Sequence, residues 1–413
     1  MKIRKDKLHP VILLGGGPIA LSVARALGKN NISCYVIDED DSIVHHSRFC
    51  IGIKHLQDEE KVTWLEWLIE QGPKLPQKFV LMPCCDYGLK IVIENRKALE
   101  EFYILPEGND EITLKMLDKY ETYKLAKSLD IPIPEVWNVE NISDLEKIAD
   151  VIQYPCALKP RISHEFSYRF HGTKMFKVKN EAELYKYYHI TQQYNLKMLI
   201  TELIPLGSEG YDGYYTHIDE NGNPLFHFTK LRLRQQPNLY GLGTYNVTNW
   251  NPEVIKLGLK FLQGIKLRGI GTLEFMRDAR DGKLKLLECN PRFTGTTELL
   301  HKSGLNWALF VYNRLVGLTT PKMDYYKRGV YIIKPLPDYL AFRELKKNNK
   351  LSFIGWIKSL MHTPHFYIWS WSDPKPFIVN TYCFWKRQLL KLFRIITLKN
   401  FLKYKPTETK NVS

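Results

Sequence analysis

Two acidic residues, an amide and an arginine stand in a segment of the sequence that can bind a metal ion and a phosphate. Residues 271–295 read GTLEFMRDARDGKLKLLECNPRFTG, which predicts two apolar strands joined by a polar Asp-Gly turn. Glu274 lies on the first strand, and the end of the second strand carries Glu288, Asn290 and Arg292 at alternate positions. Because alternate side chains of a strand share a face, these last three are expected to converge.

Carboxylate and amide oxygens are the ligands that Mg²⁺ prefers, and Mg²⁺ commonly bridges the phosphates of a substrate. An arginine two residues further on can hold a phosphate oxygen or neutralise charge that develops during a reaction. An isolated E-x-N-x-R pattern fits a hairpin with a solvated charged face equally well. Other elements of the chain decide between the two interpretations in favour of the metal site.

Cations on two other predicted strands are further candidates. Lys159 is flanked by apolar residues in YPCALKP, where a lysine is poorly placed to be only solvated. Lys230, Arg232 and Arg234 alternate and therefore share one face of their strand. Three cations on one face repel each other unless they meet an anion, although a solvated strand face explains the pattern equally well.

A glycine turn near the start of the chain gives an alternative function. Gly15-x-Gly17-x-x-Ala20 follows an apolar strand and opens a predicted helix, and Asp38 follows about 20 residues later. This pattern fits a dinucleotide-binding fingerprint, so an NAD(P)- or FAD-dependent oxidoreductase is one hypothesis. The competing hypothesis is that the glycines only make a tight turn at the start of a parallel α/β domain.

LLECNPR after GTLEF resembles the metal-binding hairpin of the ATP-grasp superfamily, whose members join a carboxylate to an amine or another nucleophile at the expense of ATP. The resemblance implies an α/β fold (α+β in the ATP-grasp part), in which a Rossmann-like domain precedes a two-lobed ATP-grasp fold and a basic C-terminal extension. The expected boundaries are 1–112 for the Rossmann-like domain, 113–200 and 201–320 for the two lobes, and 321–413 for the extension.

The same resemblance implies the ATP-binding residues. YPCALKP is similar to the strand whose lysine binds the phosphates, which is Lys159 here, and DKYETYKLAKS is similar to the junction helix that places Lys119 near them. MLITELI followed by PLGSE resembles the hinge that holds adenine. The resemblance implies that Glu202 binds the exocyclic amine of adenine and that the backbone of Leu203 and Ile204 bonds to the edge of the ring. It also implies that Glu209 accepts from a ribose hydroxyl. The expected flap over the phosphates, 161–172, has one glycine where relatives have several.

The implied chemistry needs ATP and one or two Mg²⁺, with Mn²⁺ as a possible replacement. Glu274, Glu288 and Asn290 would hold the metal, and Lys159, Arg292 and Arg232 would act in catalysis, with Lys230 on an ATP phosphate. The substrate carboxylate then attacks the γ-phosphorus to give an acyl phosphate, and an amine displaces the phosphate. No side-chain nucleophile is required, which agrees with the lack of a Ser-His-Asp or Cys-His signature.

Within the superfamily, KLRLRQQP, NPRFTG and the Asp-Pro-Lys-Pro turn that begins at residue 373 are closest to the D-aspartate ligase type. This implies amide synthesis for the cell envelope or an exopolysaccharide, with a small-molecule carboxylate and an amine as substrates. A member similar to biotin carboxylase, which handles bicarbonate and biotin, is the alternative inside the superfamily. A degenerate nucleotide-binding regulator at the membrane is disfavoured by the intact charged residues.

Composition limits the location and the partners. The chain has 413 residues and a net charge of +15, and residues 320–413 contain 18 Lys and Arg against 5 Asp and Glu, a net charge of +13. Seven scattered cysteines, no signal-like apolar run and no long apolar segment predict a cytoplasmic protein. Residues 381–402 can form a basic amphipathic helix that lies on the inner face of a membrane or packs on the body of the protein. Nucleic-acid binding is not expected, and a homodimer stays open.

Overall fold

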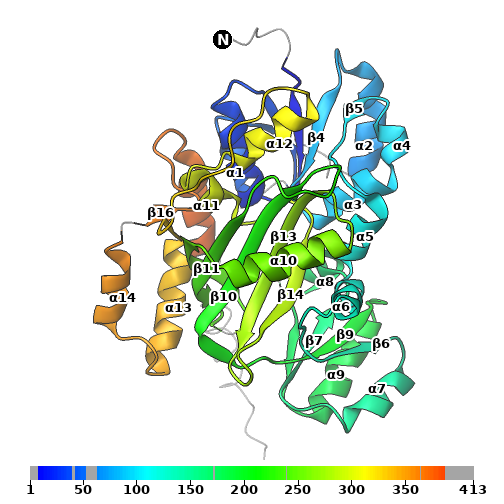
Figure 1. The fold of residues 1–413 in the computed structure, drawn as a ribbon, viewed down its shortest axis with the longest axis vertical. Coiled ribbons are helices and arrows are strands. Elements are labelled where there is room, and N and C mark those ends of the chain that lie inside the picture. Colours follow the sequence, from blue (N-terminus) through cyan, green and yellow to red (C-terminus); the bar gives the residue numbers. More distant parts are fainter. Residues whose placement is uncertain are drawn as a thin grey trace, which may run out of the picture.

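A computed structural model describes residues 8–39, 42–52, 63–170, 173–238, 240–362 and 364–386, and the strands of these residues form three sheets (Figure 1). One sheet is parallel and the other two are largely or wholly antiparallel, which confirms the predicted mixed α/β class.

The first sheet is parallel throughout and has the order β3-β2-β1-β4-β5. Its strands are β1 (Val11–Leu14), β2 (Cys34–Ile37), β3 (Ile51–Gly52), β4 (Phe79–Pro83) and β5 (Tyr103–Ile104). The intervening helices are α1 (Pro18–Gly28), η2 (Ile43–His46), α2 (Trp64–Gln71), η3 (Gly72–Lys74), α3 (Asp86–Glu94) and α4 (Arg96–Leu99). Every residue of β1 is buried, as expected for a central strand covered on both faces.

Two helices lead from this sheet to the second one. They are α5 (Asp110–Leu117) and α6 (Lys119–Ser128), and the side chain of Asp118 caps α6 by accepting the N–H of Tyr120. The second sheet has the order β6-β9-β7-β8, from β6 (Val136–Val139), β9 (Met198–Glu202), β7 (Cys156–Pro160) and β8 (Phe176–Val178). Helices α7 (Ile142–Ala149) and α9 (Glu181–Gln192) pack against it, and α8 (Ser163–Arg169) lies in the segment predicted as the flap.

The third sheet has the order β14-β13-β10-β11-β12-β15-β16. Its strands are β10 (Leu206–Ile218), β11 (Phe228–Gln236), β12 (Leu242–Asn249), β13 (Gly269–Asp278), β14 (Leu284–Asn290), β15 (Tyr331–Ile333) and β16 (His365–Phe366). The predicted hairpin is confirmed as β13 and β14. Helix α10 (Pro252–Gly264) crosses one face of the sheet and buries Phe261 and Leu262 against Tyr214 and Leu273 (Figure 1).

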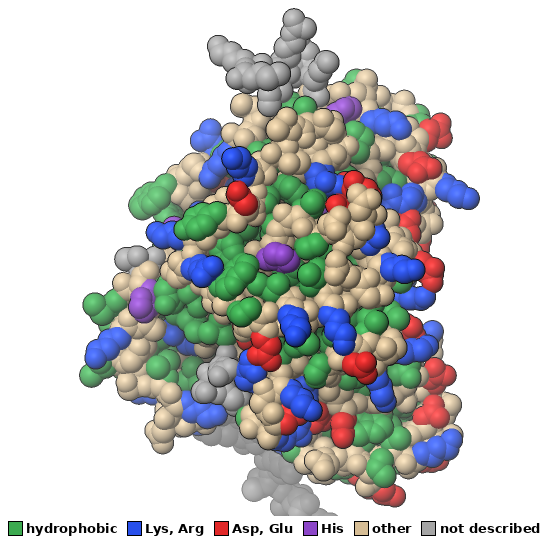
Figure 2. Space-filling view, in the orientation of Figure 1, with side chains coloured by type: hydrophobic (Ala, Val, Ile, Leu, Met, Phe, Trp, Pro, Cys, Tyr) green, Lys and Arg blue, Asp and Glu red, His purple; other side chains and the backbone are tan. Residues whose placement is uncertain are grey.

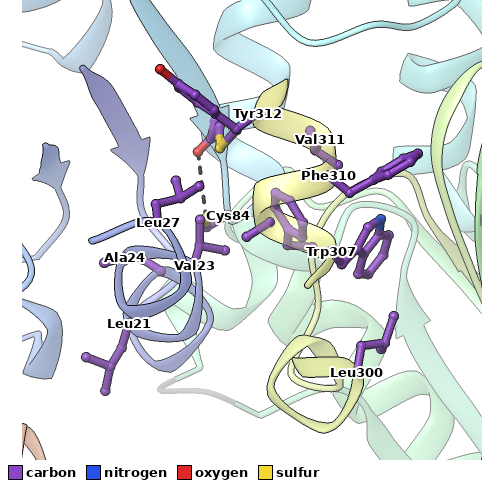
Figure 3. Close-up of a cluster of buried hydrophobic side chains, with 14 of the residues drawn as sticks. Leu21, Val23, Ala24, Leu27, Cys84, Leu300, Trp307, Phe310, Val311 and Tyr312 are labelled. Carbon is purple, nitrogen blue, oxygen red and sulfur yellow. Dashed lines mark hydrogen bonds between the residues drawn. The ribbon is translucent and has the colours of Figure 1, made fainter. Parts of the chain in front are cut away.

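A large apolar core joins the parallel sheet to the third sheet. Helices α11 (Thr297–Lys302) and α12 (Trp307–Leu315) pack against α1, so that Trp307 and Phe310 face the same cluster as Leu21, Val23 and Leu27 (Figure 3). Trp307 is fully buried and also packs edge-on against the ring of Phe293, just after the hairpin. The end of the hairpin is therefore anchored on the N-terminal domain.

The residues after 320, predicted as a separate extension, contribute β15 and β16 to the third sheet together with α13 (Pro335–Lys347) and α14 (Phe353–Leu360). The domain boundary at 320 stays a prediction. Hydrophobic side chains gather on the exposed surface over α14, including those of Phe353, Ile354 and Met361 (Figure 2). The predicted amphipathic helix 381–402 lies outside the described residues beyond 386. Within the described residues, no helix is both long and apolar enough to cross a membrane.

A buried ion pair fastens this C-terminal segment to α1. Arg25 donates from Nε to the carboxylate of Asp373 at 2.9 Å and from Nη2 to the Asp373 backbone oxygen at 2.7 Å. The hydroxyl of Ser47 and the N–H of Arg48 donate to the same carboxylate. Burial raises the pKa of Asp373, but these donors and Arg25 outweigh it, so the net pKa is lowered.

We predict that Asp373→Asn lowers the free energy of unfolding by about 3 kcal/mol at pH 7, because it leaves Arg25 buried without a counter-charge. Urea titration followed by circular dichroism measures this. A carboxylate with a lowered pKa in the folded state stabilises the protein above its unfolded pKa and loses that contribution as the pH falls, so the difference from wild type should shrink below about pH 4.

The matched control is Asp324→Asn, because Asp324 is exposed and should change the free energy of unfolding by less than about 0.5 kcal/mol. Equal effects of the two substitutions would show that the ion pair does not hold the segment in place.

Candidate active site

The hairpin places the predicted metal ligands together. In the antiparallel pairing of β13 and β14, Glu274 is directly opposite Glu288, and Asn290 is opposite Thr272. The Thr272 hydroxyl donates to the Asn290 backbone oxygen at 2.7 Å, which fixes the end of β14. The two carboxylates and the Asn290 amide therefore occupy one face of two neighbouring strands, as the alternation in the sequence predicted.

Glu274 is held by two cations from β11. Arg232 donates from Nη2 to both oxygens of Glu274, at 2.7 and 2.5 Å, and the Lys230 ammonium lies 3.6 Å from the same carboxylate. Burial raises the pKa of Glu274, but Arg232 and Lys230 outweigh it and hold the pKa far below its usual range. Glu274 is therefore ionised. Arg234, the third cation of the pattern, instead pairs with the buried Asp338 of α13.

Gly213 on β10 makes this arrangement possible. It is paired with Glu274 on one side and with Lys230 on the other. A Cβ at Gly213 would lie 2.8 Å from Lys230 Cε and 2.8 Å from the Tyr215 hydroxyl, both too close for carbon contacts. The glycine thus lets the Lys230 side chain cross β10 and reach a carboxylate two strands away.

Lys159 stands on β7 without an ion-pair partner among the described residues. Burial, together with the nearby charges of Lys119 and Lys174, lowers the pKa of Lys159 to about 8 against the opposing effect of Glu288. Lys119 begins α6 and contacts the hydroxyl of Ser163. The structure thus brings Lys119 and Lys159 within electrostatic range of each other and Lys159 within range of Glu288. Two neighbouring cations whose positive charge is not fully compensated by nearby carboxylates form a site that can bind an anion.

Arg292 connects the hairpin to the N-terminal domain. Its Nε donates to Asp86 at 2.5 Å, and its Nη2 donates to the Asn290 amide oxygen at 3.2 Å. Asp86 is the first residue of α3, just after β4. Asp86 was not predicted from the sequence, although a carboxylate after the carboxyl end of a parallel strand is a recognisable signal. Burial lowers the pKa of Arg292, but Asp86 outweighs it and raises the pKa above its usual value.

Groups of the predicted adenine hinge already bond to other parts of the protein. Glu202 accepts from the N–H of Glu135 and the Lys285 ammonium, each at 3.0 Å, and from Arg280 at 2.5 Å. Both of its oxygens are therefore engaged. Leu203 and Ile204 follow β9, and the Ile204 oxygen accepts from the Tyr240 hydroxyl at 2.8 Å. Glu209 is on β10 and its side chain is outside the described part of the chain. The adenine and ribose roles stay predictions.

The glycine turn at the start of α1 is filled by the protein itself. The Gly17 N–H donates to the Asp38 carboxylate at 2.8 Å, where a dinucleotide phosphate would have to bind. A Cβ at Gly16, which has a φ of 94°, would lie 2.5 Å from the Cys84 backbone oxygen. The glycines thus permit close packing of the loop after β4, which disfavours the oxidoreductase hypothesis.

The hairpin residues suit a hard cation such as Mg²⁺. Among the described residues no group of three or more His, Cys, Asp and Glu is placed to hold a metal, and the predicted set is instead two carboxylates and an amide. Within the same part of the chain, no hydrogen-bond donor or ion-pair partner is found for the Glu288 carboxylate. The Glu288 carboxylate therefore offers its oxygens directly. The Asn290 amide oxygen already accepts from Arg292, and Glu274 would have to give up its ion pair to hold a metal ion.

The chain is similar to known proteins in both sequence and structure. No family model matches the chain. The D-aspartate ligase of Enterococcus faecium is 24% identical over 259 residues, which are 60% of this chain and 61% of that protein. The D-alanine–D-alanine ligase of Thermoanaerobacter pseudethanolicus is 27% identical over 193 residues, 43% of this chain and 52% of that protein. The chain thus matches less than two thirds of the length of these relatives.

Among solved structures, N5-carboxyaminoimidazole synthetase from Staphylococcus aureus, complexed with ADP, superimposes with a TM-score of 0.62 at 16% identity and covers 84% of this chain and 88% of that one. The chain has the ATP-grasp fold. Biotin carboxylase from Campylobacter jejuni gives a TM-score of 0.59 at 17% identity, covering 78% of this chain and 74% of that one. The predicted mixed α/β fold of the ATP-grasp type is confirmed, whereas the bounds of the two lobes and the metal-binding role of the hairpin stay predictions.

We predict that Lys159 of this ATP-grasp protein reacts with acetic anhydride with a half-maximal rate near pH 8, because its neutral, nucleophilic amine forms at a pH well below that of an ordinary lysine. Peptide mass spectrometry after brief labelling measures the rate. The control is the same peptide labelled in urea, where the midpoint should return to about 10.4. Identical midpoints in the folded and unfolded protein would contradict the burial and repulsion described here.

Proposed function

We propose that the protein is an ATP-dependent ligase that joins a carboxylate to an amine and releases ADP and phosphate. The observation that carries the proposal is the face of the hairpin where Glu274 and Glu288 oppose each other beside Asn290 and Arg292, within electrostatic range of Lys159. The similarity to two curated ligases supports the same reaction.

The proposed roles follow from the contacts. Glu288, Asn290 and, after release of its ion pair, Glu274 would hold one or two Mg²⁺ ions, which shield the charge of the triphosphate; Mn²⁺ is a possible replacement. Lys119 and Lys159 approach from the other lobe and would bind phosphate oxygens. Arg232 and Lys230, freed from Glu274 when the metal binds, would turn to the transferring phosphoryl group.

The proposed reaction needs no side-chain nucleophile, because the substrates themselves supply the attacking atoms. A carboxylate oxygen of the substrate attacks the γ-phosphorus, the bond from that phosphorus to the bridging oxygen breaks, and ADP leaves. The amine nitrogen then attacks the carbonyl carbon of the acyl phosphate, inorganic phosphate leaves, and the nitrogen loses a proton. Arg292 would stabilise the oxygens that gain charge in both steps. Asp86 acts through Arg292 and is a positioning residue.

We further propose a role in the synthesis of cell-envelope or polysaccharide amides, on the similarity to D-aspartate ligase. The proposed location is the cytoplasm. Two further features are alternatives that the proposal allows: contact of residues 381–402 with the inner face of the membrane, and assembly as a homodimer. The alternative reaction uses bicarbonate, as in biotin carboxylase.

We predict that the purified protein forms hydroxamates from Mg-ATP, a carboxylic acid and hydroxylamine, because hydroxylamine traps an acyl phosphate whatever the natural amine is. A colorimetric hydroxamate assay with coupled ADP detection measures this over a panel of acids, with bicarbonate as a separate arm. Glu288→Gln and Lys159→Met should each lower kcat/KM at least about hundredfold, since the first removes the charge of a proposed metal ligand and the second removes a proposed cationic contact to the phosphates.

The control is Lys347→Met, because Lys347 is exposed at the far end of α13. ADP release with bicarbonate but no hydroxamate from any acid would favour the carboxylase alternative. Binding of NADH that survives both active-site substitutions would overturn the proposed function.

We predict that Asp86→Asn lowers kcat about tenfold to hundredfold while the KM for ATP changes less than twofold, because Arg292 loses its orientation rather than its charge. Steady-state kinetics at saturating ATP separate the two constants. Asp110→Asn is the matched control, since Asp110 forms a similar ion pair with Arg96. A parallel loss of kcat in both variants would mean that Asp86 only stabilises the fold.

A further inference from the structure

Helix α14 turns its apolar side chains to the outside of the molecule. Phe353, Ile357 and Met361 follow each other at intervals of four residues, so they form one row along the helix surface, and Ile354 lies beside them. In chain order these four residues of the apolar row are 54, 67, 41 and 75% exposed. The row is about 12 Å long, because a helix rises about 1.5 Å per residue.

The inner side of α14 is fixed by specific contacts. Trp356 stacks on Phe342 of α13 with 4.7 Å between the ring centres, and its Nε1 donates to the buried Asp338 at 2.9 Å. The Ser359 hydroxyl accepts from Arg234 of β11 at 2.8 Å. Figure 1 shows α14 on the outer side of α13, away from the strands of the third sheet. These contacts set the rotation of α14 about its axis, so the apolar row cannot turn towards the protein.

The chain around the apolar row is basic. Residues 346–372 contain four lysines and neither aspartate nor glutamate. All four lysines are exposed, and they are Lys346, Lys347, Lys350 and Lys358. Exposed apolar side chains with cations beside them complement a surface that has negative charge above an apolar interior, and an anionic lipid bilayer is such a surface.

We propose that α14 docks on an anionic lipid membrane, with its apolar row inserted among the headgroups and the neighbouring lysines on lipid phosphates. The inference is independent of the proposed reaction, and it concerns a different element from residues 381–402. Because Trp356 and Ser359 connect α14 to α13 and β11, docking would hold the third sheet close to the lipid surface.

Two other occupants fit the apolar row less well. A second copy of the chain would bring two sets of lysines together. The row is also only about 12 Å long and about 10 Å wide, whereas each partner of a stable complex buries about 800 Å². The C-terminal residues 387–413 of this chain contain seven Lys and Arg against one Glu, so their charge is repelled by the same lysines. Charge complementarity therefore favours the lipid.

The test is co-sedimentation of the full chain with vesicles of phosphatidylcholine, either alone or with about 30% phosphatidylglycerol. Wild type should bind the anionic vesicles at least about tenfold more strongly than the neutral ones. The double variant Ile354→Glu/Met361→Glu should weaken binding to the anionic vesicles at least about tenfold, because two apolar contacts are replaced by charges that the lipid phosphates repel.

The matched control is Ile142→Glu/Val151→Glu, which adds the same charge at two exposed apolar residues in and just after α7. It should bind within about twofold of wild type, since α7 belongs to the second sheet. The conservative variant Ile354→Leu/Met361→Leu should also keep its binding. Circular dichroism of each variant checks that the fold is intact.

The position of the contact is decided by Lys391→Glu/Arg394→Glu, which changes the basic tail instead. Binding that is lost in this variant but survives Ile354→Glu/Met361→Glu would overturn the inference and assign membrane contact to the tail. Loss in both variants, with the α7 control unchanged, would support α14 together with a second contact.

Three other results would also contradict the inference. They are equal binding of neutral and anionic vesicles, no binding of wild type to either, and a wild-type dimer in sedimentation velocity that Ile354→Glu/Met361→Glu converts to a monomer. The last result would make the apolar row a contact between copies of the chain. None of these measurements uses ATP, so failure of the inference and failure of the ligase function are observed separately.

Discussion

The candidate site depends on one ionised carboxylate that is held between two cations across a glycine. Glu274 can stay ionised in a largely buried position because Arg232 and Lys230 approach it over Gly213. This contact requires β10 to lie between β11 and β13, and it therefore fixes the order of the central strands. It also keeps the charged groups on one face of the sheet, while α10 buries apolar residues on the opposite face.

The ion pair has a second effect, because it bears on the proposed binding of a metal ion and of phosphate. Both oxygens of Glu274 accept from Arg232. Under the proposed function, Glu274 would have to give up this ion pair to hold a metal ion, and Arg232 and Lys230 would then be free to compensate a triphosphate. The charges of the ligand-free site thus neutralise each other in part, which lowers the cost of keeping them out of water.

The parts of the structure that the sequence predicted are local in the chain. The hairpin and the strand of Lys159 were recognisable because strand alternation and an Asp-Gly turn both act over a few residues. Asp86 was not, because its partner Arg292 is 206 residues away in the chain. Likewise the turn of Gly15–Gly17 has the sequence of a dinucleotide site, yet the distant Cys84 and Asp38 occupy the space around it. Composition alone also showed that the positive charge gathers after residue 320, but it could not show that this segment contributes β15 and β16 to the third sheet.

The pairing of Arg25 with Asp373 has a consequence for how the protein is made. The two residues are 348 positions apart, so at a synthesis rate of 5–20 residues per second α1 exists for about 20 to 70 s before its partner is translated. Until β15 is translated, β12 is an open edge strand able to pair with other chains. All strands of the parallel sheet are translated early, whereas β15 and Asp373 come much later in the chain. An incomplete chain still attached to the ribosome can therefore contain the whole β13–β14 hairpin while β12 and Arg25 still lack their partners.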